Sequence, residues 1–123
     1  MTIRTISPDA ADGRPYVPAV AARGELVFVS GQIPLRDGEL VGPSIETQTQ
    51  AVFANIESIL GDAGATVDDI VRCGVFLADL DDLPRFNAVY EQVFRGGFPS
   101  RTTVGVDLPG YGVEVDCIAV VNL

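Results

Sequence analysis

The sequence predicts an α+β fold in which two helices pack on one face of a β-sheet. Strand-like and helix-like apolar patterns follow one another in the order strands, helix, strand, helix, strands. The chain has 123 residues, of which 47% are hydrophobic, and this is enough to bury one core. We therefore expect residues 1–123 to form a single domain.

The first third of the chain contains predicted strands and turns. Residues 3–6 form a short strand candidate, and the prolines and the glycine that follow it predict an extended segment. β-Branched and aromatic residues predict a strand over 25–33. After this strand, Asp37-Gly38 is a typical hairpin turn.

Capping residues and apolar spacing predict the two helices. Ser44 caps the first helix, whose apolar residues recur every three or four positions until Gly64 ends it. The second helix begins at Asp81, carries a proline in its first turn, and ends at the glycine pair 96–97.

Three further strands are predicted over 70–77, 101–108 and 113–121, the first of them preceded by a capped turn. The turn residues 109–112 predict a hairpin between the last two strands. Strands 70–77 and 113–121 are apolar on both faces, yet two helices can cover only one face of the sheet. The uncovered face predicts a homo-oligomer.

The charge and the missing residue types restrict the chemistry. Eight basic and 17 acidic residues give a net charge of −9, which disfavours nucleic-acid binding. The sequence contains no His and no Lys, so His-dependent triads, imidazole metal ligands and Schiff bases are excluded. Without a Gly-rich phosphate loop either, we expect no metal and no cofactor.

The surroundings of the two cysteines and the lengths of the apolar segments indicate the cellular compartment of the protein. Cys73 and Cys117 lie in apolar strands without CxxC spacing, which favours buried, inert thiols over a disulfide or zinc site. No stretch approaches the roughly 20 apolar residues of a membrane helix, and the N-terminal segment lacks the apolar run of a signal peptide. We expect a soluble, cytoplasmic protein.

Three charged residues on the last strands are candidates for a functional site. Arg101 opens its strand, where a guanidinium can bind a carboxylate through two hydrogen bonds. An edge Arg that is solvated or paired with an acid is equally compatible with the pattern. Glu114 and Asp116 share one face of the last strand and could orient water. A simple polar outer face is the alternative.

Four other residues are candidates for a binding pocket. Ser30 and Gly31 interrupt an apolar strand, either to border a ligand cleft or to form a bulge. Asn87 lies in the second helix one position off its apolar stripe, and Tyr16 lies among prolines. Each of these two can contact a ligand, but simple exposure of Asn87 and a hydrophobic role of Tyr16 are the alternatives.

Five segments distributed over almost the whole chain carry a family resemblance: PYVPAV (15–20), FVSGQIPL (28–35), FNAVYEQVF (86–94), FPSRTTVGV (98–106) and VEVDCIAVV (113–121). Together they closely resemble the RidA (YjgF) family of imine deaminases. The combination of SGQIP with FP-x-R some 65 residues later is specific. The resemblance implies a chorismate-mutase-like mixed sheet and a homotrimer whose sheets form a barrel, with ligand sites in clefts between subunits.

The resemblance also implies an activity and the residues that carry it. The reaction would be hydrolysis of 2-imino acids, such as 2-iminopropanoate and 2-iminobutanoate, to 2-keto acids and ammonia. Arg101 would bind the substrate carboxylate and Glu114 would hold the attacking water. Tyr16, Ser30, Gly31 and Asn87 match the family's pocket positions, whereas Thr103 stands where the family commonly has Cys. A non-catalytic, small-molecule-binding trimer is the alternative function.

The predicted hairpin has a geometric consequence. If residue 107 pairs with residue 113, Arg101 and Glu114 point to opposite faces of the sheet. The two side chains then meet only across a subunit boundary or after a bulge. The sequence therefore predicts a composite site.

Overall fold

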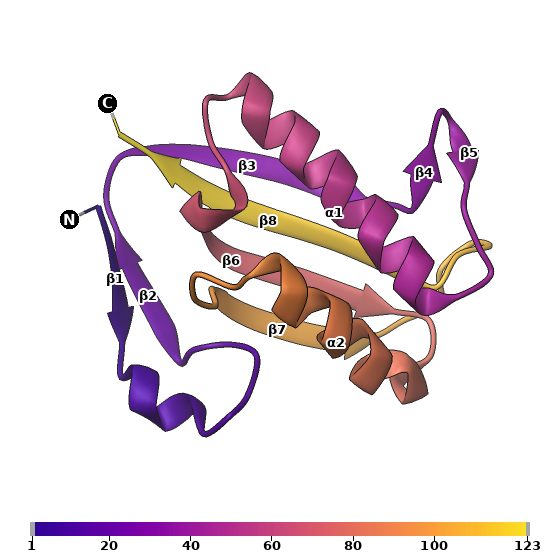
Figure 1. The fold of residues 1–123 in the computed structure, drawn as a ribbon, viewed down its shortest axis with the longest axis horizontal. Helices are drawn as coiled ribbons and strands as arrows, with labels where there is room; N and C mark the ends of the chain where they lie inside the picture. Colours follow the sequence, from indigo (N-terminus) through magenta and orange to yellow (C-terminus); the bar gives the residue numbers. More distant parts are fainter. Residues whose placement is uncertain (1, 123) are drawn as a thin grey trace.

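A four-stranded sheet forms the centre of the computed structural model, which describes residues 2–122 (Figure 1). Its strands are β3 (Glu25–Gln32), β6 (Ile70–Leu77), β7 (Ser100–Gly105) and β8 (Val113–Val121). They lie in the order β3-β8-β6-β7. β8 is antiparallel to β3 and β6, whereas β6 and β7 are parallel, so the sheet is mixed.

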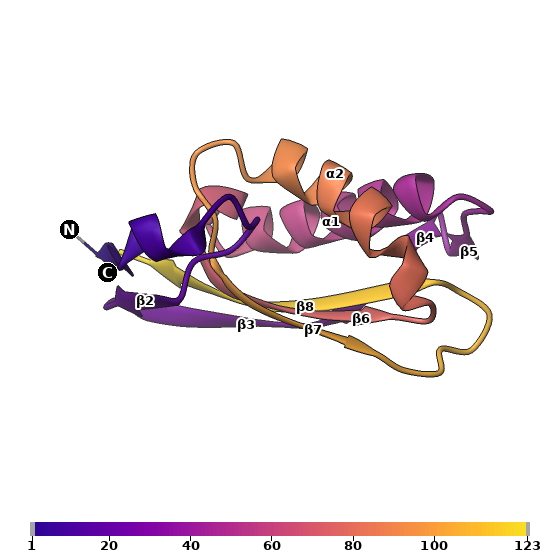
Figure 2. The ribbon, with the colours of Figure 1, turned by 90° about the horizontal axis from the view of Figure 1, so that it is seen from below.

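Two helices cover one face of this sheet, α1 (Ile45–Asp62) and α2 (Leu83–Val93) (Figure 2). Figure 2 also shows that the opposite face carries no helix. This arrangement confirms the predicted α+β class with both helices on one side. Short 3₁₀ turns occupy Pro8–Ala11, Val67–Asp69 and Leu80–Asp82.

Two small hairpin-like pairs lie outside the main sheet. β1 (Ile3–Ile6) pairs with β2 (Ala19–Ala22), and β4 (Leu35–Arg36) pairs with β5 (Glu39–Leu40). The predicted turn at Asp37-Gly38 joins β4 to β5, and both of its residues have positive φ, at 54° and 81°. None of the helices in the described residues is long and apolar enough to cross a membrane.

The predicted hairpin between the last two strands is wrong. β7 pairs with β6 in parallel, and β8 lies between β3 and β6. A parallel pair needs a crossover connection, and α2 provides it between β6 and β7. β6 and β8 carry apolar residues on both faces, so burial favours them at the centre of the sheet, and β7 becomes an edge strand.

Local signals set the ends of the helices. At the start of α1, the Ser44 hydroxyl accepts a hydrogen bond from the Thr47 backbone N–H at 3.1 Å. After α1, Gly64 has a φ of 76°, a conformation that glycine adopts without strain. α2 begins at Leu83 rather than at Asp81, because residues 80–82 form a 3₁₀ turn that the Asp79 carboxylate caps.

A single cluster of buried side chains fills the space between the helices and the sheet. Phe53, Ile56 and Leu60 of α1 are at most 2% exposed and belong to the same buried cluster as Val75 of β6 and Val115 of β8. Burial of such side chains is the main favourable term in folding. The core therefore fixes both helices on one side of the sheet.

Gln48 is a buried polar residue that connects α1 to the loop before β8. Its Nε2 donates to the Pro43 carbonyl at 3.2 Å, and its Oε1 accepts from the Gly112 N–H at 2.8 Å. We predict that Gln48→Ala lowers the free energy of unfolding by about 1–3 kcal/mol, because it removes two partly buried hydrogen bonds, each of which contributes about 0.5–1.5 kcal/mol. Denaturant unfolding measures this loss. Gln50→Ala, on the exposed side of the same helix, should change stability by less than about 0.5 kcal/mol, and an equal loss in the two variants would contradict the assignment.

The face of the sheet without helices carries large apolar side chains. Val27 and Val29 of β3 pack toward the core, so the alternating residues Leu26 and Phe28 point to the other face, where they are 52% and 69% exposed. Val104 of β7 is 41% exposed on the same face. We call this surface the open face; in the single chain it is in contact with solvent.

Candidate functional site

The predicted site residues fall on two sides of the sheet. Cys73 of β6 has Arg101 as its partner on β7 and Cys117 as its partner on β8, so these three residues share the helix-covered face. Phe76 has Val104 and Glu114 as its partners, which places Glu114 on the open face. Arg101 and Glu114 therefore point to opposite faces, as predicted, although the strand pairing differs from the prediction.

Arg101 lies on the edge strand β7 and is surrounded by aromatic rings. Its guanidinium carbon is 4.8 Å from the ring centre of Tyr90, 5.2 Å from that of Tyr16 and 5.6 Å from that of Phe86. These distances are typical of cation–π contacts. The backbone N–H of Val17 donates to the Pro99 carbonyl at 3.3 Å, which holds the segment with Tyr16 beside the start of β7.

No acidic side chain within the described residues forms an ion pair with Arg101. Its Nη1 atom is buried and has no hydrogen-bond partner in residues 2–122. Burial lowers the pKa of Arg101, and the neighbouring Tyr90 and Tyr16 partly offset this effect. The alternative in which Arg101 is an edge residue paired with an acid therefore does not hold within this chain.

Other polar atoms on the helix-covered side also lack partners. Asn87 Oδ1 on α2 and Thr103 Oγ1 on β7 are buried, and no hydrogen bond satisfies either of them within the described part of the chain. Thr103 shares its face of β7 with Arg101. These buried atoms are therefore free to form hydrogen bonds beyond those of the described chain.

Ser30 and Gly31 lie on β3, at the opposite edge of the sheet from Arg101. The register of β3 against β8 shifts between Val29 and Gln32, so Ser30 and Gly31 form a bulge. Both residues also line a hollow on the open face, so the bulge is compatible with a place at the border of a cleft. A side chain at position 31 would collide with the Glu114 carboxylate. The missing side chain of Gly31 therefore makes room for Glu114.

Glu114 and Asp116 differ in their partners on the open face. The Tyr111 hydroxyl donates to Glu114 Oε1 at 3.2 Å, while Asp116 Oδ1 accepts from the Gly74 N–H at 3.1 Å and lies 3.8 Å from Arg72. Desolvation, and next the hydrogen bond to Glu114, raise the pKa of Tyr111. Asp116 is thus tied to its own sheet, and Glu114 is the freer of the two carboxylates.

A hollow of about 330 Å³ on the open face lies beside the bulge. Its lining includes Ser30, Gly31, Arg72 and Asp116. The hollow is shallow and open to solvent, and Arg101 does not contribute to it. Arg101 and this hollow therefore lie on opposite faces of the sheet, and one chain does not bring Arg101 and Glu114 together.

Both cysteines are free and buried, as predicted. Burial raises the pKa of Cys73 and the pKa of Cys117 to about 12, so both thiols are protonated at neutral pH. No group of three His, Cys, Asp or Glu side chains in residues 2–122 is placed to hold a metal ion.

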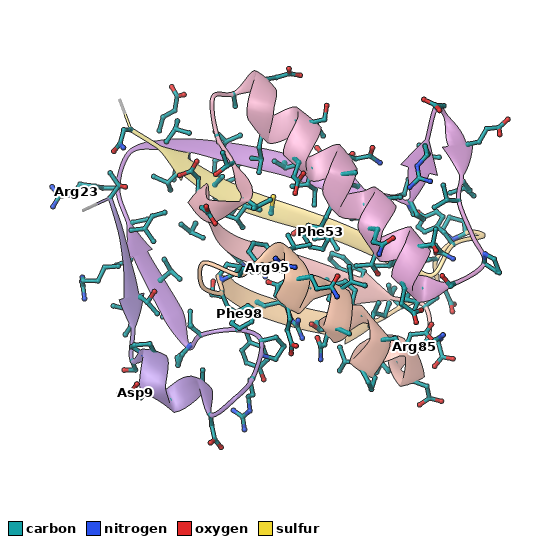
Figure 3. All side chains as sticks on the ribbon, viewed as in Figure 1. Asp9, Arg23, Phe53, Arg85, Arg95 and Phe98 are labelled. Atoms are coloured by element: carbon teal, nitrogen blue, oxygen red, sulfur yellow. The ribbon has the colours of Figure 1, made fainter. Side chains whose placement is uncertain are left out.

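Sequence reasoning missed two residues next to the candidate groups. The sequence pattern predicts Tyr90 only as an apolar residue of the second helix and Tyr111 only as a residue of the turn 109–112. Tyr90 is completely buried, and the rings of Phe53 and Phe98, both labelled in Figure 3, pack against it with centres 5.8 Å and 6.2 Å away. A Tyr at a buried apolar position was the available signal, because its hydroxyl needs a partner.

Comparisons with known proteins connect this geometry to one family. The model of the Endoribonuclease L-PSP family matches residues 7–121. AldR of Lactococcus lactis, described as a candidate regulator, is 44% identical over an alignment of 124 positions that covers 98% of this chain and 97% of AldR. The 2-iminobutanoate/2-iminopropanoate deaminase of Dermatophagoides farinae is 36% identical over an alignment of 112 positions that covers 88% of this chain and 87% of that protein. The crystal structure of YyfB, a Rid-family protein of Yersinia pestis, superposes with a TM-score of 0.88 at 28% identity, covering 98% of this chain and all of that one.

Proposed function

Because the chain belongs to the Endoribonuclease L-PSP family, which includes the Rid (YjgF) proteins, we propose that it hydrolyses small 2-imino acids to 2-keto acids and ammonia. The observation that carries this proposal is the buried guanidinium of Arg101, which has aromatic neighbours but no acidic partner in the described chain. A related protein bears the name of this activity, with 2-iminobutanoate and 2-iminopropanoate as substrates.

Arg101 binds the substrate carboxylate in this proposal. A planar guanidinium matches a carboxylate through two parallel hydrogen bonds, and the bond is stronger where water is excluded. The rings around Arg101 hold its cation without neutralising it, so the positive charge stays available to an anionic ligand. Tyr16, Asn87 and Thr103 line the same side and contact the rest of the substrate.

Glu114 holds the water that attacks the imine carbon. Its carboxylate accepts a hydrogen bond from Tyr111, which orients it above Gly31 on the open face. Arg101 and Glu114 of one chain lie on opposite faces, so the site combines Arg101 of one copy with Glu114, Ser30 and Gly31 of another. A homotrimer built through the open face, in the cytoplasm, is part of the same proposal.

The reaction needs neither a metal nor a covalent nucleophile. A protonated imine is already electrophilic: the water oxygen bonds to C2 while the C=N π electrons move to nitrogen, and Glu114 accepts the water proton. Glu114 returns this proton to the amino nitrogen, and the C–N bond breaks with its electron pair on the leaving ammonia. The hydroxyl oxygen forms the C=O bond of the 2-keto acid, and its proton passes through Glu114 to water. Arg101 contributes by fixing C2 in front of the water.

Release of ammonia and keto acid from imines generated in situ tests the proposal. Purified protein should accelerate hydrolysis of 2-iminopropanoate and 2-iminobutanoate above the rate without protein. A protein that binds these compounds but leaves their hydrolysis rate unchanged would instead be a ligand-binding or regulatory trimer. The similarity to AldR, described as a candidate regulator, favours this as the second candidate.

We do not propose RNA cleavage, although the family description names an endoribonuclease. The net charge of −9 repels a polyanion, and the chain has neither His nor Lys to bind phosphate or to exchange protons near neutral pH.

The open face makes a prediction about assembly. Phe28→Glu places a charge on a side chain that is 69% exposed in the single chain and buried in the proposed trimer. We expect this variant to be a folded monomer by light scattering at micromolar concentration and to lose most of its activity. Ile59→Glu changes an exposed apolar residue on α1 and should remain assembled and active. A trimeric, active Phe28→Glu variant would contradict assembly through the open face.

A further inference from the structure

Tyr90 is held rigidly in the core, yet its hydroxyl lacks a partner. Its side chain is completely buried, and its ring contacts Phe53, Phe86, Phe94 and Phe98 at centre distances of 4.6 to 6.2 Å. The buried hydroxyl makes no hydrogen bond of good geometry to any described residue, and the Cys73 thiol and the Arg101 guanidinium lie next to it. Phe would fill the same space without burying an unsatisfied polar group, so packing alone does not explain a Tyr at this position.

The guanidinium of Arg101 lies over the ring of Tyr90. The guanidinium carbon lies closer to the ring of Tyr90, at 4.8 Å, than to those of Tyr16 and Phe86. The Nη1 atom of Arg101 is also buried without a partner, so an unsatisfied donor and an unsatisfied hydroxyl occur in two side chains that touch. Cys73 lies next to both, because it is the strand partner of Arg101.

The charge states of these groups agree with a contact between them. Burial raises the pKa of Tyr90, so the phenol stays neutral and its oxygen can accept a hydrogen bond from the guanidinium. Arg101 in turn lowers the pKa of Tyr90, and Tyr90 raises that of Arg101. A neutral acceptor orients the guanidinium without forming the ion pair that would compete with an anionic ligand.

We infer that Tyr90 is a positioning residue for Arg101. Its ring supports the guanidinium plane, and its hydroxyl accepts a hydrogen bond from Nη1 once the guanidinium turns toward a bound carboxylate, which fixes the rotation of that plane. This inference rests on the proposed role of Arg101 in carboxylate binding. Tyr90 belongs to the apolar stripe of α2, which packs in the core. In this role it contributes to the specificity for carboxylate ligands without touching the substrate.

Tyr90→Phe tests this role because it keeps the ring and removes only the hydroxyl. The ligands are pyruvate, the keto-acid product of 2-iminopropanoate, and pyruvamide, which has the same size but no carboxylate. We expect the variant to bind pyruvate about five- to tenfold more weakly in calorimetric titrations, as for the loss of one hydrogen bond. Binding of pyruvamide and the melting temperature should not fall.

If Tyr90 acts only through Arg101, its contribution to binding must disappear when Arg101 is replaced, so the Arg101→Gln variant provides the control. In this background, adding Tyr90→Phe should cause no further loss of pyruvate binding. With the imine substrates, Tyr90→Phe should raise KM and leave kcat nearly unchanged.

Three results would overturn the inference: unchanged pyruvate binding in Tyr90→Phe, equal weakening for pyruvate and pyruvamide with a lower melting temperature, or wild-type protein that binds neither ligand. The last result would also remove the proposed carboxylate site. If the wild type binds pyruvate in a Tyr90-dependent way but does not hydrolyse imines, the inference holds and the proposed deaminase function fails.

Discussion

Replacing Arg101 with Ala is expected to lower kcat/KM for 2-iminopropanoate by at least about a hundredfold. The substitution removes both the charge that binds the carboxylate and the geometry that places the imine carbon before the water. It also leaves the aromatic neighbours of Arg101 in place, since Tyr90 and Phe86 belong to the core cluster. The fold should therefore persist, and steady-state release of ammonia measures the loss.

Two further variants separate charge from geometry at this position. Arg101→Lys keeps a positive charge but cannot form two parallel hydrogen bonds, so we expect it to recover only a small part of the lost activity. Arg95→Ala removes an exposed Arg at the end of α2, labelled in Figure 3, and should behave as wild type. Activity close to wild type in Arg101→Ala would exclude the proposed carboxylate site.

The elements that sequence analysis predicted well are those that local chemistry determines. Ser44 caps α1, and positive φ values occur at Asp37, Gly38 and Gly64, where turn or end signals stand in the sequence. These signals act over four or five residues and do not depend on the rest of the fold. They therefore appear in the sequence directly.

Strand order could not be predicted in the same way, because it depends on contacts between distant segments. The turn residues 109–112 suggested a hairpin, but β8 pairs with β3 and β6 instead. The same apolar pattern that predicted a buried β8 also explains its central place, yet the pattern does not name its neighbours. The prediction that Arg101 and Glu114 face opposite sides still holds, because both registers align Arg101 with the same face of β8. The predicted hairpin aligns Arg101 with Ala119, and the observed sheet aligns it through Cys73 with Cys117.

The candidate site was predictable only in part for a related reason. Arg101 and Glu114 stand out as charged residues on otherwise apolar strands, whereas Tyr90 has the periodicity of a core residue. Its unsatisfied hydroxyl and its contact with Arg101 exist only in three dimensions. The meeting of Arg101 with Glu114 requires a second copy of the chain and stays a prediction.

Replacing Glu114 with Gln should lower kcat by about a hundredfold or more, the usual contribution of a positioned general base. Gln keeps the size of the side chain above Gly31 but cannot accept the water proton, so KM should change little. Glu57→Gln, on the exposed side of α1, serves as the matched control and should retain full activity. Full activity in Glu114→Gln would remove the proposed role of Glu114.

The composite site makes a stronger prediction for a mixture of the two inactive variants. If each site takes Arg101 from one copy and Glu114 from its neighbour, some sites in a mixed trimer of Arg101→Ala and Glu114→Gln chains contain both native residues. Random mixing of equal amounts gives about one site in four of this kind, since each position is native with a chance of about one half. Refolding the two variants together should therefore restore about a quarter of wild-type activity, whereas separate refolding restores none. Without such recovery in mixed trimers, Arg101 and Glu114 would have to act within one chain, which their positions on opposite faces of the sheet oppose.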